Sequence, residues 1–147
     1  MLNQDYKEML LRLLEEDVKF LLVGAYALAA LGFPRATGDM DIFIQPDENN
    51  AERVYKALIK FGAPLQNITV KDFSTSGTIF QIGIIPRRIG IINSIDGVTF
   101  EDAYRNRVII EIESMSIPVL SKDHMIKNKN STGRAKDKVD AETLENS

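Results

Sequence analysis

The stretch VGAYALAALGFPRATGDMDIFI, residues 23–44, decides the fold of this chain. A glycine follows directly on the short apolar run Phe20–Val23, which predicts a buried strand that turns at once into a short helix. Near the end of the stretch, a Gly-Asp turn leads into a second apolar strand. Asp39 and Asp41 are two residues apart, so on an extended chain their side chains point the same way, with Cα atoms roughly 6 to 7 Å apart.

Two carboxylates on one face need an explanation, because at about 4 Å they repel each other by roughly 4 kcal/mol at an effective dielectric near 20. Solvent screening would relieve this repulsion, and a turn-capping pair of the kind common in Gly-Asp sequences would also account for the acids. A divalent cation is the sharper hypothesis, since Mg²⁺ binds carboxylates together with phosphate oxygens and water. The amides of Gly24 and Ala25, at the start of the predicted helix, are suited to hold the phosphates.

The remaining pattern predicts an α/β (α+β) fold, with a mixed sheet of about five strands covered by helices. Short apolar or β-branched runs bounded by Gly, Pro, Asn or Asp predict strands at 20–23, 41–45, 78–83, 88–93 and 108–112. Apolar residues at helical spacing predict covering helices around residues 6–14 and 51–58, the second ending near Gly62. Pro86-Arg87 predicts a hairpin, and Thr99 has the position of a helix cap.

Composition excludes several classes of protein. With 147 residues and 44% hydrophobic content, we expect a single domain over residues 1–147. No cysteine is present, which excludes disulfides and thiolate catalysis, and the sole histidine, His124, cannot supply a multi-histidine zinc site. No apolar run approaches the roughly 20 residues that span a bilayer, and the first residues lack the order of a signal peptide. We therefore expect a soluble, cytoplasmic protein without membrane contact.

The order of these motifs resembles a known family. Gly24-Ala25, thirteen further residues and then Asp39-x-Asp41 resemble the signature of the DNA polymerase β-type nucleotidyltransferase superfamily, a Gly-Gly or Gly-Ser turn followed by Asp-x-Asp. The run 32–44 is similar to its small, stand-alone bacterial members related to abortive-infection and toxin–antitoxin nucleotidyltransferases. The similarity extends through FQIG (80–83), SIDGVTFEDAY (94–104), IPVLS (117–121) and NKNSTGRAKDKVD (128–140).

The resemblance implies a nucleotidyltransferase-like fold and a metal-dependent reaction. In that reaction NMP is transferred from an NTP substrate to an acceptor, and pyrophosphate is released. Asp39 and Asp41 would be the catalytic, metal-binding residues, with Mg²⁺ or Mn²⁺ as cofactor. Arg35, Thr37 and Gly38, just before the acids, are candidate phosphate contacts, although a turn after the preceding proline explains them nearly as well.

One departure from the family pattern bears on activity. Such enzymes carry a third carboxylate on a later strand, expected here within a pattern like Arg-Ile-Asp, whereas this chain reads Arg88-Ile89-Gly90. Loss of that acid should impair chemistry more than nucleotide binding. Asp96, in a predicted turn six residues later, is a candidate replacement as metal ligand, and Glu111 and Glu113 are more remote ones.

The C-terminal segment, about residues 121–147, is predicted to be helical and basic. Between residues 122 and 138 it has six Lys or Arg against two Asp, so it could bind the phosphates of a nucleotide or of RNA. The alternative is that these cations are solvated positions on two terminal helices broken at Gly133. Lys129 and Arg134 are the candidate phosphate ligands, because they lie in a segment that resembles the family.

Three functions remain open at this point. The first is an active nucleotidyltransferase whose acceptor is a protein, an RNA or a small molecule. The second is a nucleotidyltransferase fold without turnover, acting as a nucleotide-binding or regulatory partner of antitoxin-like kind. The third is an RNA-docking surface on the basic tail. A homodimer or a complex with a toxin-like partner is compatible with the first two.

Overall fold

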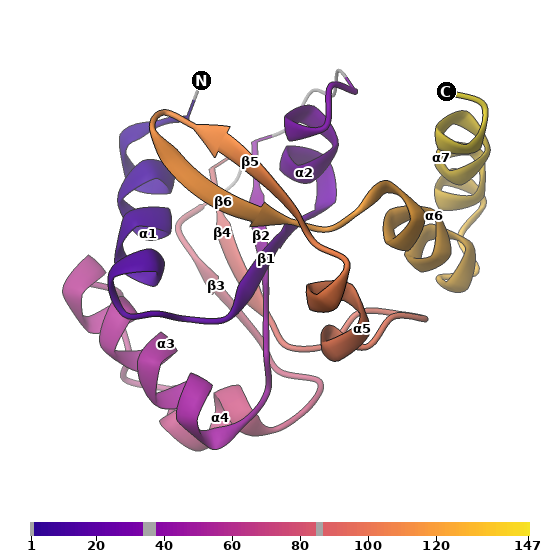
Figure 1. The fold of residues 1–147 in the computed structure, drawn as a ribbon. Coiled ribbons are helices and arrows are strands. Elements are labelled where there is room, and N and C mark those ends of the chain that lie inside the picture. Colours follow the sequence, from indigo (N-terminus) through magenta and orange to yellow (C-terminus); the bar gives the residue numbers. More distant parts are fainter. Residues whose placement is uncertain (1, 34–37, 85–86) are drawn as a thin grey trace.

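The computed structural model describes residues 2–33, 38–84 and 87–147. Six strands in these ranges form one mixed sheet in the order β3-β4-β2-β1-β6-β5 (Figure 1). The strands are β1 (Phe20–Val23), β2 (Met40–Ile44), β3 (Ile79–Ile82), β4 (Ile89–Ile92), β5 (Val108–Ile112) and β6 (Met115–Val119). β2 pairs antiparallel with β1 and parallel with β4, and β1 pairs parallel with β6. The antiparallel pairs β3–β4 and β5–β6 complete the two edges of the sheet.

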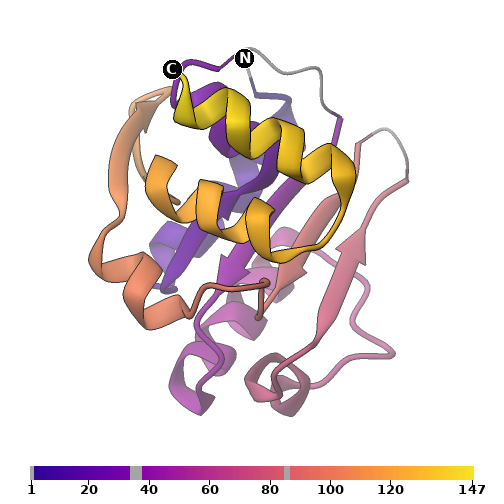
Figure 2. The same cartoon turned by 90° about the vertical axis from the view of Figure 1, so that its right-hand side faces the viewer.

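Helices cover both faces of the sheet (Figures 1 and 2). They are α1 (Gln4–Glu15), α2 (Gly24–Ala30), α3 (Glu48–Phe61), α4 (Val70–Ser74), α5 (Phe100–Arg105), α6 (Lys122–Ser131) and α7 (Ala135–Glu145). α1, α3 and α4 lie on one side, and α2, α5, α6 and α7 lie on the other. Among the residues described, no helix is long and apolar enough to cross a membrane.

Side-chain caps explain where most helices begin. The cap residues are Asn3, Asp47, Thr69, Thr99 and Ser121, and each accepts a hydrogen bond from the amide three residues later. α3 ends at Gly62, whose positive φ of 88° gives the left-handed conformation that terminates many helices. The predicted cap at Thr99 and the predicted end at Gly62 are therefore confirmed.

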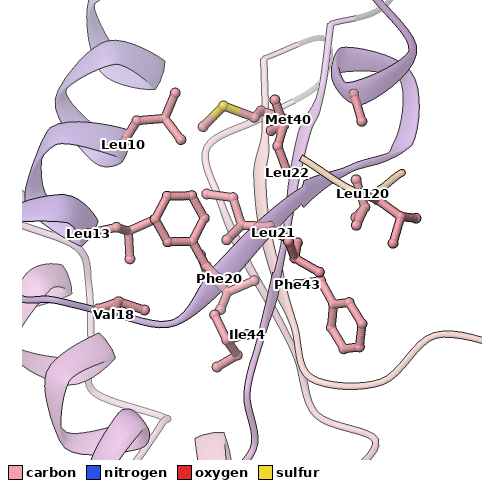
Figure 3. Close-up of a cluster of buried hydrophobic side chains, with 14 of the residues drawn as sticks. Leu10, Leu13, Val18, Phe20, Leu21, Leu22, Met40, Phe43, Ile44 and Leu120 are labelled. Atoms are coloured by element: carbon pink, nitrogen blue, oxygen red, sulfur yellow. The ribbon is translucent and has the colours of Figure 1, made fainter. Parts of the chain in front are cut away.

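The buried core shows which way the residues of β2 point. Figure 3 shows Met40 turned toward Leu10 of α1, whereas Phe43 lies on the other side of the sheet. Phe43 there makes an edge-to-face contact with Phe100 of α5, with ring centroids 5.0 Å apart. Because side chains alternate along a strand, Asp41 lies on the same face as Phe43. The acid therefore faces the side of α2, α5, α6 and α7.

A tight turn docks the C-terminal helices against the sheet. Residues 95–98 form a turn closed by an Ile95–Val98 bridge, and Asn128 of α6 donates a hydrogen bond to the carbonyl oxygen of Asp96 at 2.9 Å. Gly97 has a φ of 74°, and any Cβ at this position would overlap the side chain of Ser131. Glycine is thus required here for both its backbone conformation and its size.

The sequence predicted the fold class and five of the six strands, and β5 has the predicted bounds. β6 was not predicted, and it occupies an interior position between β1 and β5. It contains Pro118, which has no amide hydrogen and is unusual inside a sheet. The short helix α4 was also missed. The predicted hairpin is confirmed by the β3–β4 pairing, although Pro86 itself lies outside the described residues.

Candidate functional site

Asp41 lies between two glycines. In the sheet it stands beside Val23 of β1 on one side and Gly90 of β4 on the other. A Cβ placed on Gly24 would be 3.0 Å from Oδ2 of Asp41, and a Cβ placed on Gly90 would be 2.7 Å from Oδ1. Each carboxylate oxygen therefore occupies space that is open because a glycine is there. Gly24 also has a φ of 71°, which a residue with a side chain rarely adopts.

The environment of Asp41 disfavours its charged form. Burial raises the pKa of Asp41 above its usual value, and the neighbouring charge of Asp39 raises it further. Arg88 acts in the opposite direction and lowers this pKa, but it does not cancel the other two effects. The two acids are thus close enough to interact, as the spacing of two residues along the strand requires. A cation bound at Asp41 would relieve the cost of its charge.

Asp39 is held by Arg88, the residue just before β4. The backbone N–H of Arg88 donates to Oδ1 of Asp39 at 3.1 Å, and its guanidinium Nη2 donates to Oδ2 at 3.1 Å. About a third of each side chain remains exposed, 36% for Asp39 and 30% for Arg88. A carboxylate gripped by both a backbone amide and a guanidinium has a fixed orientation.

Tyr6 of α1 ties together the backbone on both sides of this ion pair. Its buried hydroxyl hydrogen-bonds the carbonyl oxygen of Gly38 and that of Arg88, the latter at 3.0 Å. Its ring packs edge-to-face on Tyr26 of α2 at 5.3 Å. Burial, followed by Tyr26, Asp39 and Asp41, raises the pKa of Tyr6 to about 12, so the hydroxyl keeps its proton at neutral pH. Tyr6 thus positions the entry of β2 relative to that of β4.

The structure brings part of the predicted site together. Gly24 contacts Asp41, as described above, and Ala25 follows it in the first turn of α2. Gly38 precedes the acids and is fixed through its carbonyl oxygen. Arg35 and Thr37 lie outside the described residues, so the structure adds nothing on their predicted phosphate contacts.

Three other predicted residues lie elsewhere. Asp96 sits in the turn that closes on α6, and among the described residues no three Asp, Glu, His or Cys side chains form a group that could hold a metal. The structure therefore does not group Asp96 with Asp39 and Asp41, and its role as a metal ligand stays a prediction. Lys129 and Arg134 were predicted to bind phosphate, but both form ion pairs within the α6–α7 hairpin, Lys129 with Asp137 and Asp140 and Arg134 with Asp137.

The residues present fit one magnesium ion. Carboxylate oxygens are the hard ligands that Mg²⁺ prefers, and Mg²⁺ in nucleotide sites commonly uses one or two carboxylates, phosphate oxygens and retained waters. Asp41 offers such oxygens next to Asp39 and close to Gly24, the first residue of α2. One carboxylate together with phosphate oxygens and waters meets this requirement, whereas a site made of protein ligands alone would need more of them.

Comparison with protein-family models and with curated protein sequences finds no match. Among solved structures, the chain is similar to a candidate nucleotidyltransferase (TM1012) from Thermotoga maritima. The TM-score is 0.67 at 21% sequence identity, and the match covers 99% of this chain and 94% of that one. The chain has a nucleotidyltransferase fold. At this level of identity the similarity concerns the fold, and the roles of individual residues must be argued from the geometry.

Within the nucleotidyltransferase-like fold of this chain, the pairing of β2 with β4 shows where the missing third carboxylate would lie. Asp41 and Gly90 are direct neighbours on parallel strands, so the position expected to carry the third acid lies immediately beside Asp41. Sequence reasoning noticed the absence of this acid but missed the role of Arg88. The available signal was its spacing: residues two apart on a strand share a face, so Arg88 and Gly90 both lie toward the acids of β2.

Proposed function

We propose that this chain is a metal-dependent nucleotidyltransferase, which transfers NMP from an NTP to an acceptor and releases pyrophosphate. One observation carries the proposal: the carboxylate of Asp41 lies between Gly24 and Gly90, beside Asp39 and at the start of α2. An acid in this position can share a cation with a triphosphate held at the first amides of the helix. The similarity in fold to a candidate nucleotidyltransferase supports this reading.

Each residue has a defined part in the proposed reaction. The amides of Gly24 and Ala25 bind triphosphate oxygens, and Asp41 and Asp39 face the region of the α-phosphate. An acceptor oxygen attacks the α-phosphorus, the bond to the bridging oxygen of the β-phosphate breaks, and the acceptor's proton passes to water. Mg²⁺ or Mn²⁺, when bound at Asp41 beside Asp39, would supply positive charge to the phosphate oxygens.

A transfer assay tests this proposal. The chain is incubated with Mg²⁺ or Mn²⁺ and each α-labelled NTP, with RNA, small hydroxyl compounds or protein as acceptor. Protein acceptors include a second copy of the chain and a toxin-like partner. We expect release of pyrophosphate together with a labelled acceptor, and loss of both in Asp41→Asn. Glu52→Gln, which removes an exposed carboxylate of α3 on the other face, is the matched control and should be fully active.

A second candidate is a nucleotide-binding protein without turnover, acting as a sensor or an antitoxin-like regulator. Two observations favour it. Glycine stands at position 90, where the third acid is expected, and Arg88 already forms an ion pair with Asp39. In this case calorimetry would show metal-dependent binding of a nonhydrolysable triphosphate, while the transfer assay would show no product. Gly90→Asp should then introduce turnover, provided that Asp41 can shift from the new Cβ.

A further inference from the structure

Two pairs of residues face each other across β2 and β4, side by side. Asp39, just before β2, binds Arg88, just before β4, and Asp41 then stands beside Gly90. The first pair is an acid with a cation, and the second is an acid beside a residue that has no side chain. The two acids therefore differ in what they can offer to a metal ion, although the sequence makes them look equivalent.

The first acid already has a positive charge beside it. Arg88 binds Asp39 through its guanidinium and through its backbone amide, and its Nε is buried with no hydrogen-bond partner among the described residues. The guanidinium is therefore partly enclosed by protein rather than extended into solvent. A metal ion at Asp39 would have to displace this cation, or lie against it and be repelled.

The second acid lacks a comparable partner on its neighbouring strand. Gly90 contributes no side chain, and Oδ1 of Asp41 packs so closely against this glycine that a Cβ there would be 2.7 Å from it. Asp41 is also the acid whose charge is poorly compensated by the protein itself.

We infer that Arg88 replaces one metal ion of a two-metal site, so that this chain binds a single divalent cation, at Asp41. Two-metal phosphoryl transfer uses ions about 3.5 to 4 Å apart, which clamp the attacking and leaving oxygens. Here a fixed guanidinium supplies the positive charge at Asp39 instead. The inference deepens the proposed nucleotide site, and it concerns metal stoichiometry rather than the reaction.

Arg88 acts through Asp39 and is therefore a positioning residue. With Asp39 and Asp41 ionised and Arg88 positive, the three side chains carry one net negative charge. Removal of Arg88 alone makes this charge more negative and takes the guanidinium away from Asp39. Removal of Arg88 together with Asp39 keeps the net charge and leaves Asp41 in place. Comparing Mn²⁺ binding by these two variants shows whether Asp39 is a metal ligand or an acid that Arg88 already neutralises.

The test is a titration of the full-length chain with Mn²⁺ alone, in which electron paramagnetic resonance measures the free ion. We expect one Mn²⁺ per wild-type chain and loss of binding in Asp41→Asn. The double variant Asp39→Asn/Arg88→Met should keep one Mn²⁺ at close to wild-type affinity. Arg88→Met alone should bind Mn²⁺ about tenfold more tightly or take up a second ion, because one positive charge has been removed. Arg88→Lys, which restores that charge, should behave as wild type.

Three results would overturn the inference: two Mn²⁺ per wild-type chain, no Mn²⁺ bound by the wild type, or loss of binding in the double variant equal to that in Asp41→Asn. Circular dichroism confirms that each variant is folded, and if Arg88→Met is not, the double variant decides. The transfer assay is scored independently. One bound Mn²⁺ without transfer would contradict the proposed activity alone, and transfer with two bound Mn²⁺ would contradict this inference alone.

Discussion

Within residues 2–33, 38–84 and 87–147, two clusters of charged side chains are each built around a pair of aspartates. In the α6–α7 hairpin, Nζ of Lys129 lies 3.6 Å from Asp137 and 3.3 Å from Asp140, and Nε of Arg134 lies 2.7 Å from Asp137. Two cations thus balance two acids. At the start of β2 and β4, Arg88 forms an ion pair with Asp39, and its charge also acts on the neighbouring Asp41.

The pKa values of the two clusters move in opposite directions. Burial raises the pKa of Asp137, but the hydrogen bond from Thr132 and the charges of Lys129 and Arg134 outweigh it, so the net shift is downward. Burial and Asp39 raise the pKa of Asp41. The balanced cluster therefore stabilises a helical hairpin, whereas the unbalanced one costs the fold free energy. An acid kept at such a cost is typical of a functional position.

Among the variants that test this difference between the two clusters, Asp41→Asn should have the largest effect. We expect the affinity for a Mn²⁺–nucleotide complex to fall by about 100-fold or more. The variant removes the proposed metal ligand itself, and loss of a residue that only hydrogen-bonds a metal ligand already costs about 10- to 100-fold. The melting temperature should not fall, because the variant removes a buried charge and its repulsion with Asp39. Calorimetry and thermal unfolding measure the two effects. A clear loss of stability with unchanged nucleotide affinity would mean that Asp41 supports the fold and does not bind the metal.

Asp137→Asn should give the reverse pattern. The variant weakens the ion pairs with Lys129 and Arg134 and leaves Lys129, whose side chain is 16% exposed, with less compensation. We expect the free energy of unfolding to fall by about 1 to 2 kcal/mol, measured by chemical denaturation. Mn²⁺ affinity should stay at the wild-type value. A drop in Mn²⁺ affinity comparable to that of Asp41→Asn would mean that the hairpin belongs to the site.

The pH dependence of stability should separate the two clusters by sign. The folded pKa of Asp137 is lowered, so its contribution to stability is complete above the usual value of 3.8 and is lost as the pH falls through the folded pKa. The folded pKa of Asp41 is raised, so wild type should gain stability relative to Asp41→Asn as the pH falls from neutral toward 3.8. Denaturation of wild type and both variants between about pH 3 and 7 measures these differences, and shifts of the same sign would contradict the comparison.

The smallest expected effect is that of Tyr6→Phe. The variant removes the hydroxyl that bonds the carbonyl oxygens of Gly38 and Arg88, so stability should fall by about 1 kcal/mol. Because the carbonyl oxygen of Gly38 lies at the entry of β2, the strand that carries Asp41, Mn²⁺ affinity should fall as well. Tyr55→Phe, on α3, is the control and should leave Mn²⁺ affinity unchanged. An equal effect of both variants on Mn²⁺ binding would remove Tyr6 from the site.

Much of the fold follows from local signals in the sequence. Short apolar runs with clear boundaries gave β1 and β5, and capping residues such as Thr99 marked helix starts. The strand β6 escaped prediction because Pro118 argues against an interior strand, and its interior place in the sheet depends on pairing with β1, which is distant along the chain. Tertiary contacts outweigh local preference at this strand.

The site was predictable where neighbours in sequence are also neighbours in space. The spacing of two residues placed Asp39 and Asp41 on one face, but nothing in that spacing reveals that Arg88, 49 residues later, binds Asp39. The same limit applies to Lys129. Its place in a basic run suggested a phosphate ligand, whereas the hairpin pairs it with Asp137 and Asp140. Net charge along a segment does not show which charges are already neutralised.

The close approach of Gly97 to Ser131 also limits how this sequence can evolve. The turn at 95–98 and the end of α6 meet with no room for a Cβ at position 97. Replacing that glycine would require a smaller residue opposite it, or a shift of the whole C-terminal hairpin. Homologous chains should therefore show covariation between these two positions, with a side chain at the first accompanied by glycine at the second.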